Sequence, residues 1–161
     1  MRFLPALAGL TLALGFGAAL AQEVAFPGLR TDPDAQVEVT ADSLSVHQAD
    51  GAAVFTGNVL IVQGPMRLKA EKVEVEYGAD RSRIAKLHAS GGVTLVSGKD
   101  AAEAREAVYE VAAGAVELTG DVLLTQGPNV LSGQHMTIDL KTGTGRMDGR
   151  VRTILQPGET P

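Results

Sequence analysis

The residues of this chain best suited to acid–base or metal chemistry are its three histidines, His47, His88 and His135. No two of them have a short spacing, such as His-x-x-x-His, that would bring two imidazoles to one metal ion. The chain also has no cysteine, which excludes disulfides and thiolate metal sites. We therefore predict that the histidines lie on solvent-facing strands or loops, and that the chain holds no metal ion and no other cofactor.

A run of carboxylates at Glu71, Glu74 and Glu76 is a second place where chemistry could occur. Paired carboxylates can act as general acid and general base. Here, however, Glu74 and Glu76 alternate with Val73 and Val75, so on a strand the two glutamates would share one face and the two valines the other. A solvated strand face accounts for these glutamates without catalysis.

Two glycine motifs resemble nucleotide-binding loops but lack their required residues. Residues 97–100, Ser-Gly-Lys-Asp, end like a phosphate-binding loop, yet the glycine needed five positions before Gly98 is Val93. The Gly-x-Gly at 143–145 lacks the third glycine of a dinucleotide-binding loop and is better explained as a hairpin turn. With no serine-hydrolase motif either, we predict that the chain is not an enzyme.

The composition restricts the kind of partner. The chain has 161 residues, a net charge of −5, 45% hydrophobic residues and only 4% aromatic residues, with no tryptophan. Its length and hydrophobic content indicate one folded domain. The acidic balance argues against nucleic acid, which requires an excess of lysine and arginine. The shortage of rings argues against stacking on sugars, so we expect aliphatic side chains to make the binding surface.

The N-terminus has the features of a secretory signal peptide. After a short basic start, residues 3–20 are almost wholly apolar or small, and residues 19–21, Ala-Leu-Ala, fit a small-x-small cleavage site. A transmembrane anchor is the alternative, but the stretch contains Pro5 and has no basic flank. We predict a cleaved signal peptide over residues 1–21 and export of the rest of the chain.

Imperfect repeats of about 30 residues make up most of the remaining chain. Residues 56–60, Thr-Gly-Asn-Val-Leu, return as Thr-Gly-Asp-Val-Leu at 119–123, and weaker copies stand at 90–93 and 148–151. The shared glycines are Gly57, Gly91, Gly120 and Gly149. Small residues recur with the same set of spacings at Ala41, Ala70, Ala104 and Gly133.

Each repeat predicts short strands with a corner in a fixed place. Apolar and polar residues alternate with a period of two, which indicates half-buried strands. Leu68 and Ala70 are even-numbered whereas Val73 and Val75 are odd-numbered, so the apolar phase slips by one residue. Such a slip is tolerated where a strand bends and passes onto a second sheet. We predict an all-β, elongated antiparallel fold with two facing sheets, in which even residues 100–111, the best helix candidate, are strand.

The aliphatic residues at matched strand positions form the candidate lining of the interior. They are Val59, Ile61, Leu68, Val73, Val75, Val93, Leu95, Val122, Leu124, Leu131, Met136, Ile138 and Leu140. A sealed core and an open groove produce the same pattern, so periodicity leaves both open.

Four short segments in order carry a resemblance to a known family. They are residues 40–44 (Thr-Ala-Asp-Ser-Leu), 56–64, 68–71 and 89–93, and the copy at 119–127 follows. Together they resemble the LptA/OstA-like family of periplasmic lipopolysaccharide-transport proteins. The likeness extends over about residues 37–155.

The resemblance implies a V-shaped β-jelly-roll, open at both ends, over residues 37–155, after a linker at 22–36 and before a tail at 156–161. Such proteins join head to tail and bridge an inner-membrane transporter and an outer-membrane β-barrel protein. They carry lipopolysaccharide with its lipid A acyl chains in an apolar groove, which the thirteen aliphatic residues would line here. The resemblance therefore implies a periplasmic location and lipopolysaccharide as the ligand.

Other functions stay open at this point. One is a structural or assembly module of the same fold, either an LptC-like membrane-tethered partner or the isolated N-terminal part of an outer-membrane receptor. The other is a polysaccharide-active enzyme, which the lack of tryptophan disfavours. An insertion around residues 77–86 is expected to lengthen a loop carrying Arg81, Arg83 and Lys86, which is either a site for lipid phosphates or an ordinary solvated loop.

Overall fold

The computed structural model describes residues 23–25, 27–32 and 34–157, and the predicted signal peptide lies outside these residues. The described chain forms thirteen strands, all paired antiparallel, and a 3-10 turn η1 (Pro27–Leu29). The strands are β1 (Glu23–Ala25), β2 (Val37–Thr40), β3 (Ser43–Val46), β4 (Ala53–Gln63), β5 (Met66–Tyr77), β6 (Ile84–Ser90), β7 (Val93–Ser97), β8 (Asp100–Ala104), β9 (Glu106–Glu110), β10 (Ala115–Gln126), β11 (Asn129–Asp139), β12 (Thr144–Asp148) and β13 (Arg152–Ile154). The predicted all-β antiparallel class is confirmed. No helix among the described residues is long and apolar enough to span a bilayer.

The predicted corners are bulges in the long strands. Between β4 and β5 the register shifts after Thr56, so that Gly57 and Asn58 together stand opposite Glu71 alone. The same shift occurs in β10 after Thr119. An extra residue on one strand bends it and increases its twist, which turns the following residues onto another layer.

The corners of successive repeats stack into one line. The repeat glycines adopt φ between +81° and +86°, a conformation that strongly favours glycine; they are Gly57, Gly91, Gly120 and Gly149. A Cβ on each of these glycines would come within 2.9 Å of a neighbouring side chain. In every case this neighbour is the residue directly after one of the recurring small residues; the neighbours are Asp42, Glu71, Arg105 and Gln134. Both landmarks of the sequence repeat therefore meet at the corners.

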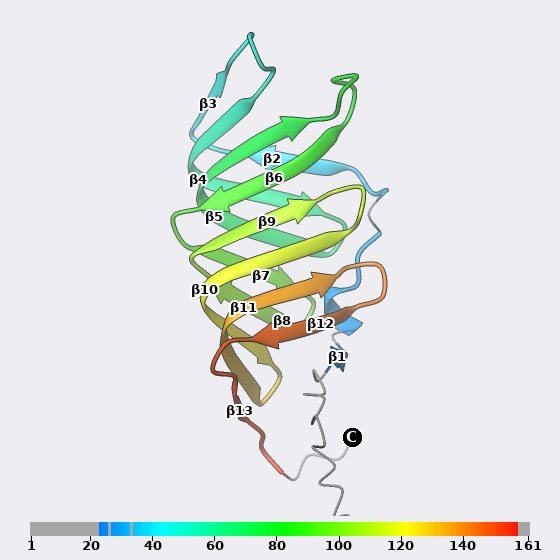
Figure 1. The fold of residues 1–161 in the computed structure, drawn as a ribbon, viewed down its shortest axis with the longest axis vertical. Helices are drawn as coiled ribbons and strands as arrows, with labels where there is room; N and C mark the ends of the chain where they lie inside the picture. Colours follow the sequence, from blue (N-terminus) through cyan, green and yellow to red (C-terminus); the bar gives the residue numbers. More distant parts are fainter. Residues whose placement is uncertain (1–22, 26, 33, 158–161) are drawn as a thin grey trace, which may run out of the picture.

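The line of corners folds the sheet into two layers (Figure 1). The front layer contains β1, β3, β6, β9 and β12, and the rear layer contains β2, β7, β8 and β13. The long strands β4, β5, β10 and β11 contribute one half to each layer. Opposite the corners, the turns at 64–65, 98–99 and 127–128 of the rear layer face the turns at 78–83, 111–114 and 140–143 of the front layer. We call this edge the seam.

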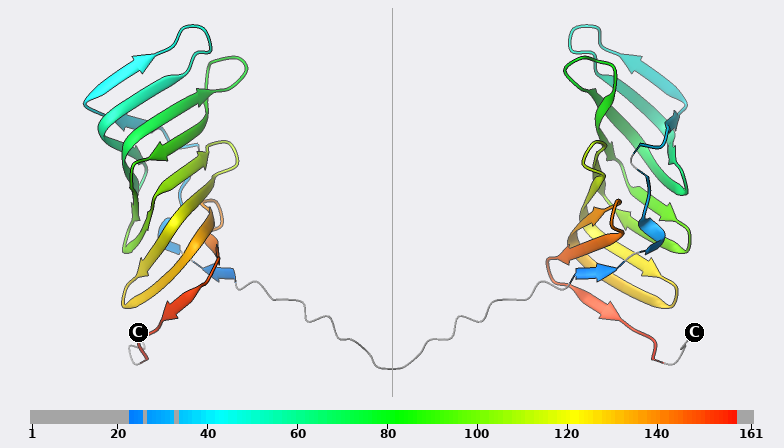
Figure 2. Two further views of the ribbon diagram at one scale, coloured as in Figure 1. Left: turned by 60° about the vertical axis from the view of Figure 1, so that its left-hand side comes forward. Right: turned by 90° about the vertical axis from the view of Figure 1, so that its right-hand side faces the viewer.

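The described residues of the segment 22–36, where we expect a linker, include β1 and η1. β1 pairs with β12, and the chain then runs up between the edges of the two layers to β2 (Figure 2, right). Leu29 at the end of η1 is fully buried in the hydrophobic core. One buried leucine does not produce a period-two pattern, so the sequence does not reveal that this segment contacts the core.

The insertion near residue 80 forms the turn between β5 and β6, which carries Arg81 and Arg83. Lys86 does not belong to this loop. It lies on β6, and its Nζ forms an ion pair with Glu110 at 3.3 Å. The predicted basic loop is therefore reduced to two arginines, because pairing of β6 with β9 places Lys86 beside an acidic strand.

Candidate functional site

The interior between the two layers contains all thirteen predicted lining residues, each less than a tenth exposed. The rear layer supplies Val59, Ile61, Leu68, Val93, Leu95, Val122, Leu124 and Leu131, and the front layer supplies Val73, Val75, Met136, Ile138 and Leu140. They belong to one continuous hydrophobic cluster, to which each of the long strands β4, β5, β10 and β11 contributes. The protein's own side chains occupy the interior between the layers.

The front layer contributes more of the interior than the sequence analysis found. The missed residues of this layer are Ala53 on β4, and the pairs Leu87 and Ala89 on β6, Ala107 and Tyr109 on β9, and Val116 and Leu118 on β10, all buried. Each pair has the period of two that marks a strand, so the signal was present.

One polar connection crosses the interior beside the seam. The buried Tyr109 hydroxyl of the front layer donates to Oε1 of Gln63 on β4 at 2.6 Å. Nε2 of Gln63 then donates to the backbone carbonyl of Ala35 at 3.0 Å. Burial raises the pKa of Tyr109, which keeps its hydroxyl protonated as the donor. The two layers and the N-terminal segment are thus tied together at this point.

At the N-terminal end, the last part of the apolar lining is not covered by other strands. Leu44 and Val46 on β3 pair with Phe55 and Ala53, which point into the interior. Yet Leu44 is 55% exposed and Val46 is 60% exposed. The inward-facing side of the last strand at this end is therefore in contact with solvent.

The C-terminal end also exposes aliphatic side chains, at Val151, Ile154 and Leu155. β13 pairs with β11 alone, and β1 pairs with β12 alone. At the other end β2 and β3 pair with β4 alone. Among the described strands, each end of the molecule thus has two edge strands with free backbone groups, which are sites for pairing with another chain.

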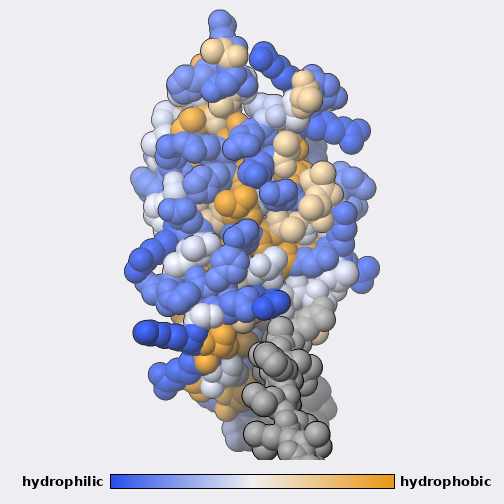
Figure 3. All heavy atoms as spheres, in the orientation of Figure 1, coloured by the Kyte–Doolittle hydropathy of each residue, from blue (hydrophilic) through white to orange (hydrophobic). Residues whose placement is uncertain are grey.

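A groove of about 830 Å³ opens along the seam near the N-terminal end. Val37, Ile84 and Val111 make its apolar walls, and Asp34 and Arg83 lie at the polar part of its lining. In the space-filling view, hydrophobic residues are visible between hydrophilic ones in the right half of the picture, toward the seam (Figure 3). This is a lateral opening between the layers rather than an opening at an end.

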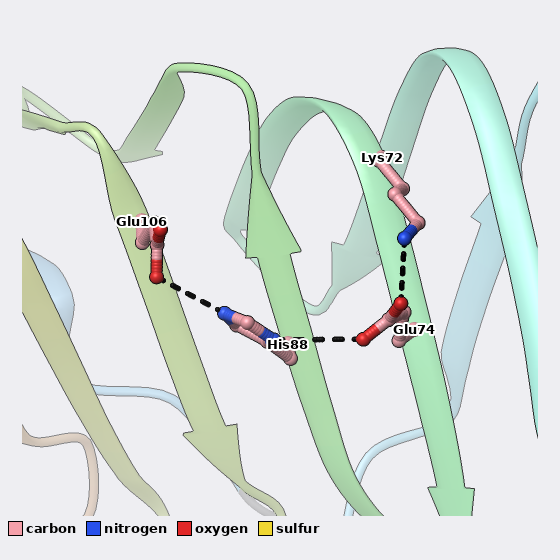
Figure 4. Close-up of polar contacts among 4 residues, drawn as sticks. All are labelled: Lys72, Glu74, His88 and Glu106. Carbon is pink, nitrogen blue, oxygen red and sulfur yellow. Dashed lines mark hydrogen bonds and ion pairs between the residues drawn. The ribbon is translucent and has the colours of Figure 1, made fainter.

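The histidines lie on the outside of the front layer or at its end, as predicted. His88 stands between two carboxylates, with Nε2 at 3.3 Å from Glu106 and Nδ1 at 3.7 Å from Glu74 (Figure 4). Nζ of Lys72 donates to Glu74 at 2.6 Å, which lowers the pKa of Glu74. His135 pairs with Glu117 on the same surface, and His47 is exposed just after β3.

These polar contacts build a charged outer surface. Val73 and Val75 are buried while Glu74 and Glu76 face outward, as the alternation predicts. Among the described residues, no group of three or more histidines and carboxylates is arranged to hold a metal ion.

The chain matches a protein family and several named relatives. The model of the family "LptA/(LptD N-terminal domain) LPS transport protein" matches residues 38–144. A Rhizobium meliloti protein called "Uncharacterized protein R00383" is 32% identical, over 94% of this chain and 89% of that protein. The "Lipopolysaccharide export system protein LptA" of Haemophilus influenzae is 26% identical, over 87% of both chains.

A solved structure shares the fold. It is LptH from Pseudomonas aeruginosa, described as the LptA homologous periplasmic component of the conserved lipopolysaccharide transport device. It superposes with a TM-score of 0.71 at 19% sequence identity, over 79% of this chain and 99% of that chain.

Proposed function

The chain belongs to the LptA/LptD N-terminal domain family of lipopolysaccharide transport proteins, and from this premise we propose that it is a periplasmic lipopolysaccharide-binding bridge protein. It would carry lipopolysaccharide from an inner-membrane transporter to an outer-membrane assembly complex. The observation that carries the proposal is the continuous aliphatic interior, which runs the length of the molecule and has exposed apolar side chains at both ends. The Haemophilus influenzae relative is named as a lipopolysaccharide export protein, and we propose no catalytic role for this chain.

The chemistry of the interior suits the acyl chains of lipid A. Moving a methylene from water to an apolar site gains about 0.8 kcal/mol, and the lining offers aliphatic side chains along its whole length. Sugars and phosphates cannot follow without losing hydrogen bonds to water. The groove in the seam supports an arrangement in which the acyl chains lie between the layers and the polar part stays in solvent. Since the interior is filled by its own side chains, the layers must part to admit a lipid.

Photo-crosslinking tests this proposal. A photoreactive amino acid at Ile61, Leu124 or Ile138, which all point into the interior, is expected to form a covalent adduct with lipopolysaccharide in growing cells. The matched control is Leu123, which lies on β10 next to Leu124 but faces outward and is 37% exposed. Gel mobility and immunodetection of the lipid would report the adduct. Equal labelling at Leu123 and Leu124, or labelling at none of the interior positions, would contradict the proposal.

We also propose that copies of the chain join head to tail through their terminal strands. The two edge strands at each end support such pairing, and so do the exposed aliphatic side chains that each end carries.

Replacing Val46 by glutamate should weaken this association. A carboxylate placed in an apolar contact is left without a partner, which should weaken the complex by at least about tenfold. Sedimentation velocity over a concentration series measures the effect. Val96→Glu puts the same charge on a similarly outward-facing valine of β7, 38% exposed and in the middle of the rear layer, and should leave the association unchanged. If both variants associate like the unchanged protein, the contact does not involve β3.

A further inference from the structure

Residues 27–32, which we call the strap, lie across the seam and place one side chain inside the protein. We propose that the strap is an intramolecular closure of the seam, that Leu29 occupies interior space which a lipid acyl chain takes up when bound, and that lipid loading displaces the strap. This inference concerns the regulation of the proposed lipid site and therefore rests on the proposed function.

The strap is fastened to the rear layer at the turn between β7 and β8. Gly28 comes so close to this turn that a Cβ on it would lie 2.6 Å from Oδ2 of Asp100 and 3.1 Å from the carbonyl oxygen of Ser97. The backbone N–H of Gly28 donates a hydrogen bond to the Asp100 carboxylate. Only a glycine at this position allows the backbone to approach so closely.

The strap is fastened to the front layer by its next residues. The backbone N–H of Thr31 donates to the carbonyl oxygen of Leu140, just beyond β11, at 2.8 Å. Between these two attachments, Leu29 is 0% exposed and belongs to the same hydrophobic cluster as the proposed lipid-lining residues. The strap thus joins the edges of both layers and closes the seam between them at this level.

Leu29 is chemically equivalent to a piece of the proposed ligand. A leucine side chain and a segment of an acyl chain are both aliphatic, and each gains free energy by leaving water for the same cluster. Interiors are packed to the density of organic crystals, so both cannot occupy one place. A lipid that enters between the layers and reaches this level would have to expel Leu29.

Several polar groups around the strap would be better hydrated if the strap left the seam. Thr31 Oγ1 and Ser97 Oγ are buried and have no hydrogen-bond partner among the described residues. Asp100 is also buried, and burial raises its pKa because the charged form loses water. Opening the strap would return all three groups to water, which offsets part of the cost of exposing Leu29.

A single cysteine can report the position of the strap, because the chain has no cysteine of its own. Thr31→Cys is a mild change, since it replaces a buried hydroxyl that lacks a partner among the described residues. We expect the thiol of the purified full chain to react slowly with a maleimide, and at least about ten times faster once purified lipopolysaccharide is added. Delipidated core oligosaccharide, which has the sugars without the acyl chains, should produce no acceleration.

A pair of alanine substitutions distinguishes release of the strap from general loosening of the fold. In the Thr31→Cys chain, Leu29→Ala should accelerate labelling without lipid because it removes the anchor. Arg30→Ala should not, because Arg30 is exposed. Hydrogen exchange of the Thr31 amide in the unchanged protein gives the same information without a cysteine.

The outcomes distinguish this inference from the proposed function. If lipopolysaccharide crosslinks to Ile138 but changes neither thiol labelling nor amide exchange, the strap proposal is wrong and the transport proposal stands. If lipopolysaccharide neither crosslinks nor changes labelling, both fail. Fast labelling of Thr31→Cys without lipid, together with unprotected exchange of the Thr31 amide in the unchanged protein, would show that the strap does not close the seam.

Discussion

Replacing Leu124 by alanine is expected to lower the free energy of unfolding by about 2–5 kcal/mol, whereas the same change at Leu123 should cost less than about 1 kcal/mol. The two leucines are neighbours on β10 and differ only in the side of the strand they occupy. Leu124 is 0% exposed between the layers, and Leu123 is 37% exposed on the outside. Truncating the inward leucine removes buried apolar surface and leaves a cavity, since close-packed neighbours relax only partly.

Urea unfolding, followed by circular dichroism, measures this difference directly. Because both variants carry the same chemical change in the same strand, any effect on intrinsic strand propensity cancels between them. An equal and small loss of stability at both positions would mean that Leu124 borders an interior open to solvent. An equal and large loss would mean that β10 is covered on both faces.

Replacing Gly91 by alanine is expected to destabilise the protein by about 2–5 kcal/mol, and replacing Gly92 by about 1–2 kcal/mol. Both glycines have positive φ, +82° and +86°, so both substitutions strain the backbone. Only Gly91 lies at a corner contact. A Cβ there would come 2.6 Å from Cβ of Glu71, which is fixed to the backbone of β5 and cannot swing away.

Gly92 is the control for the backbone strain, because a Cβ on it would meet nothing within 4 Å. The difference between the two alanine variants in thermal or urea unfolding therefore isolates the close packing at the corner. Equal losses would show that the corners are held by backbone conformation alone, and that the contact between glycine and side chain contributes nothing.

Most of the strand pattern was predictable because strand geometry is local. Side chains alternate between the two faces of a strand whatever it pairs with, so a period of two identifies the inward residues without knowledge of the partner. The repeat decided the one ambiguous segment. Residues 100–111 have helix-favouring alanines, yet they form β8 and β9, with a corner at Arg105 between them.

Features that depend on residues far apart in the chain were not predictable. The hydrogen bond between Tyr109 and Gln63 joins residues 46 positions apart, and the sequence around neither residue predicts the other as its partner. The role of residues 27–32 was missed for the same reason. Their contacts are with the turn at Ser97 and with the end of β11, which only the folded sheet brings beside them.

The sequence by itself determined the antiparallel strands, the place of each corner and which side chains face inward. Each of these follows from alternation and from glycines at repeated positions, and both act over a few neighbouring residues. Only the tertiary structure decided that the inward side chains fill the space between the layers, that both ends keep free strand edges, and that Leu29 closes the seam. These properties depend on how far apart two layers stand and on which distant segments meet at their edge, distances that no local pattern encodes.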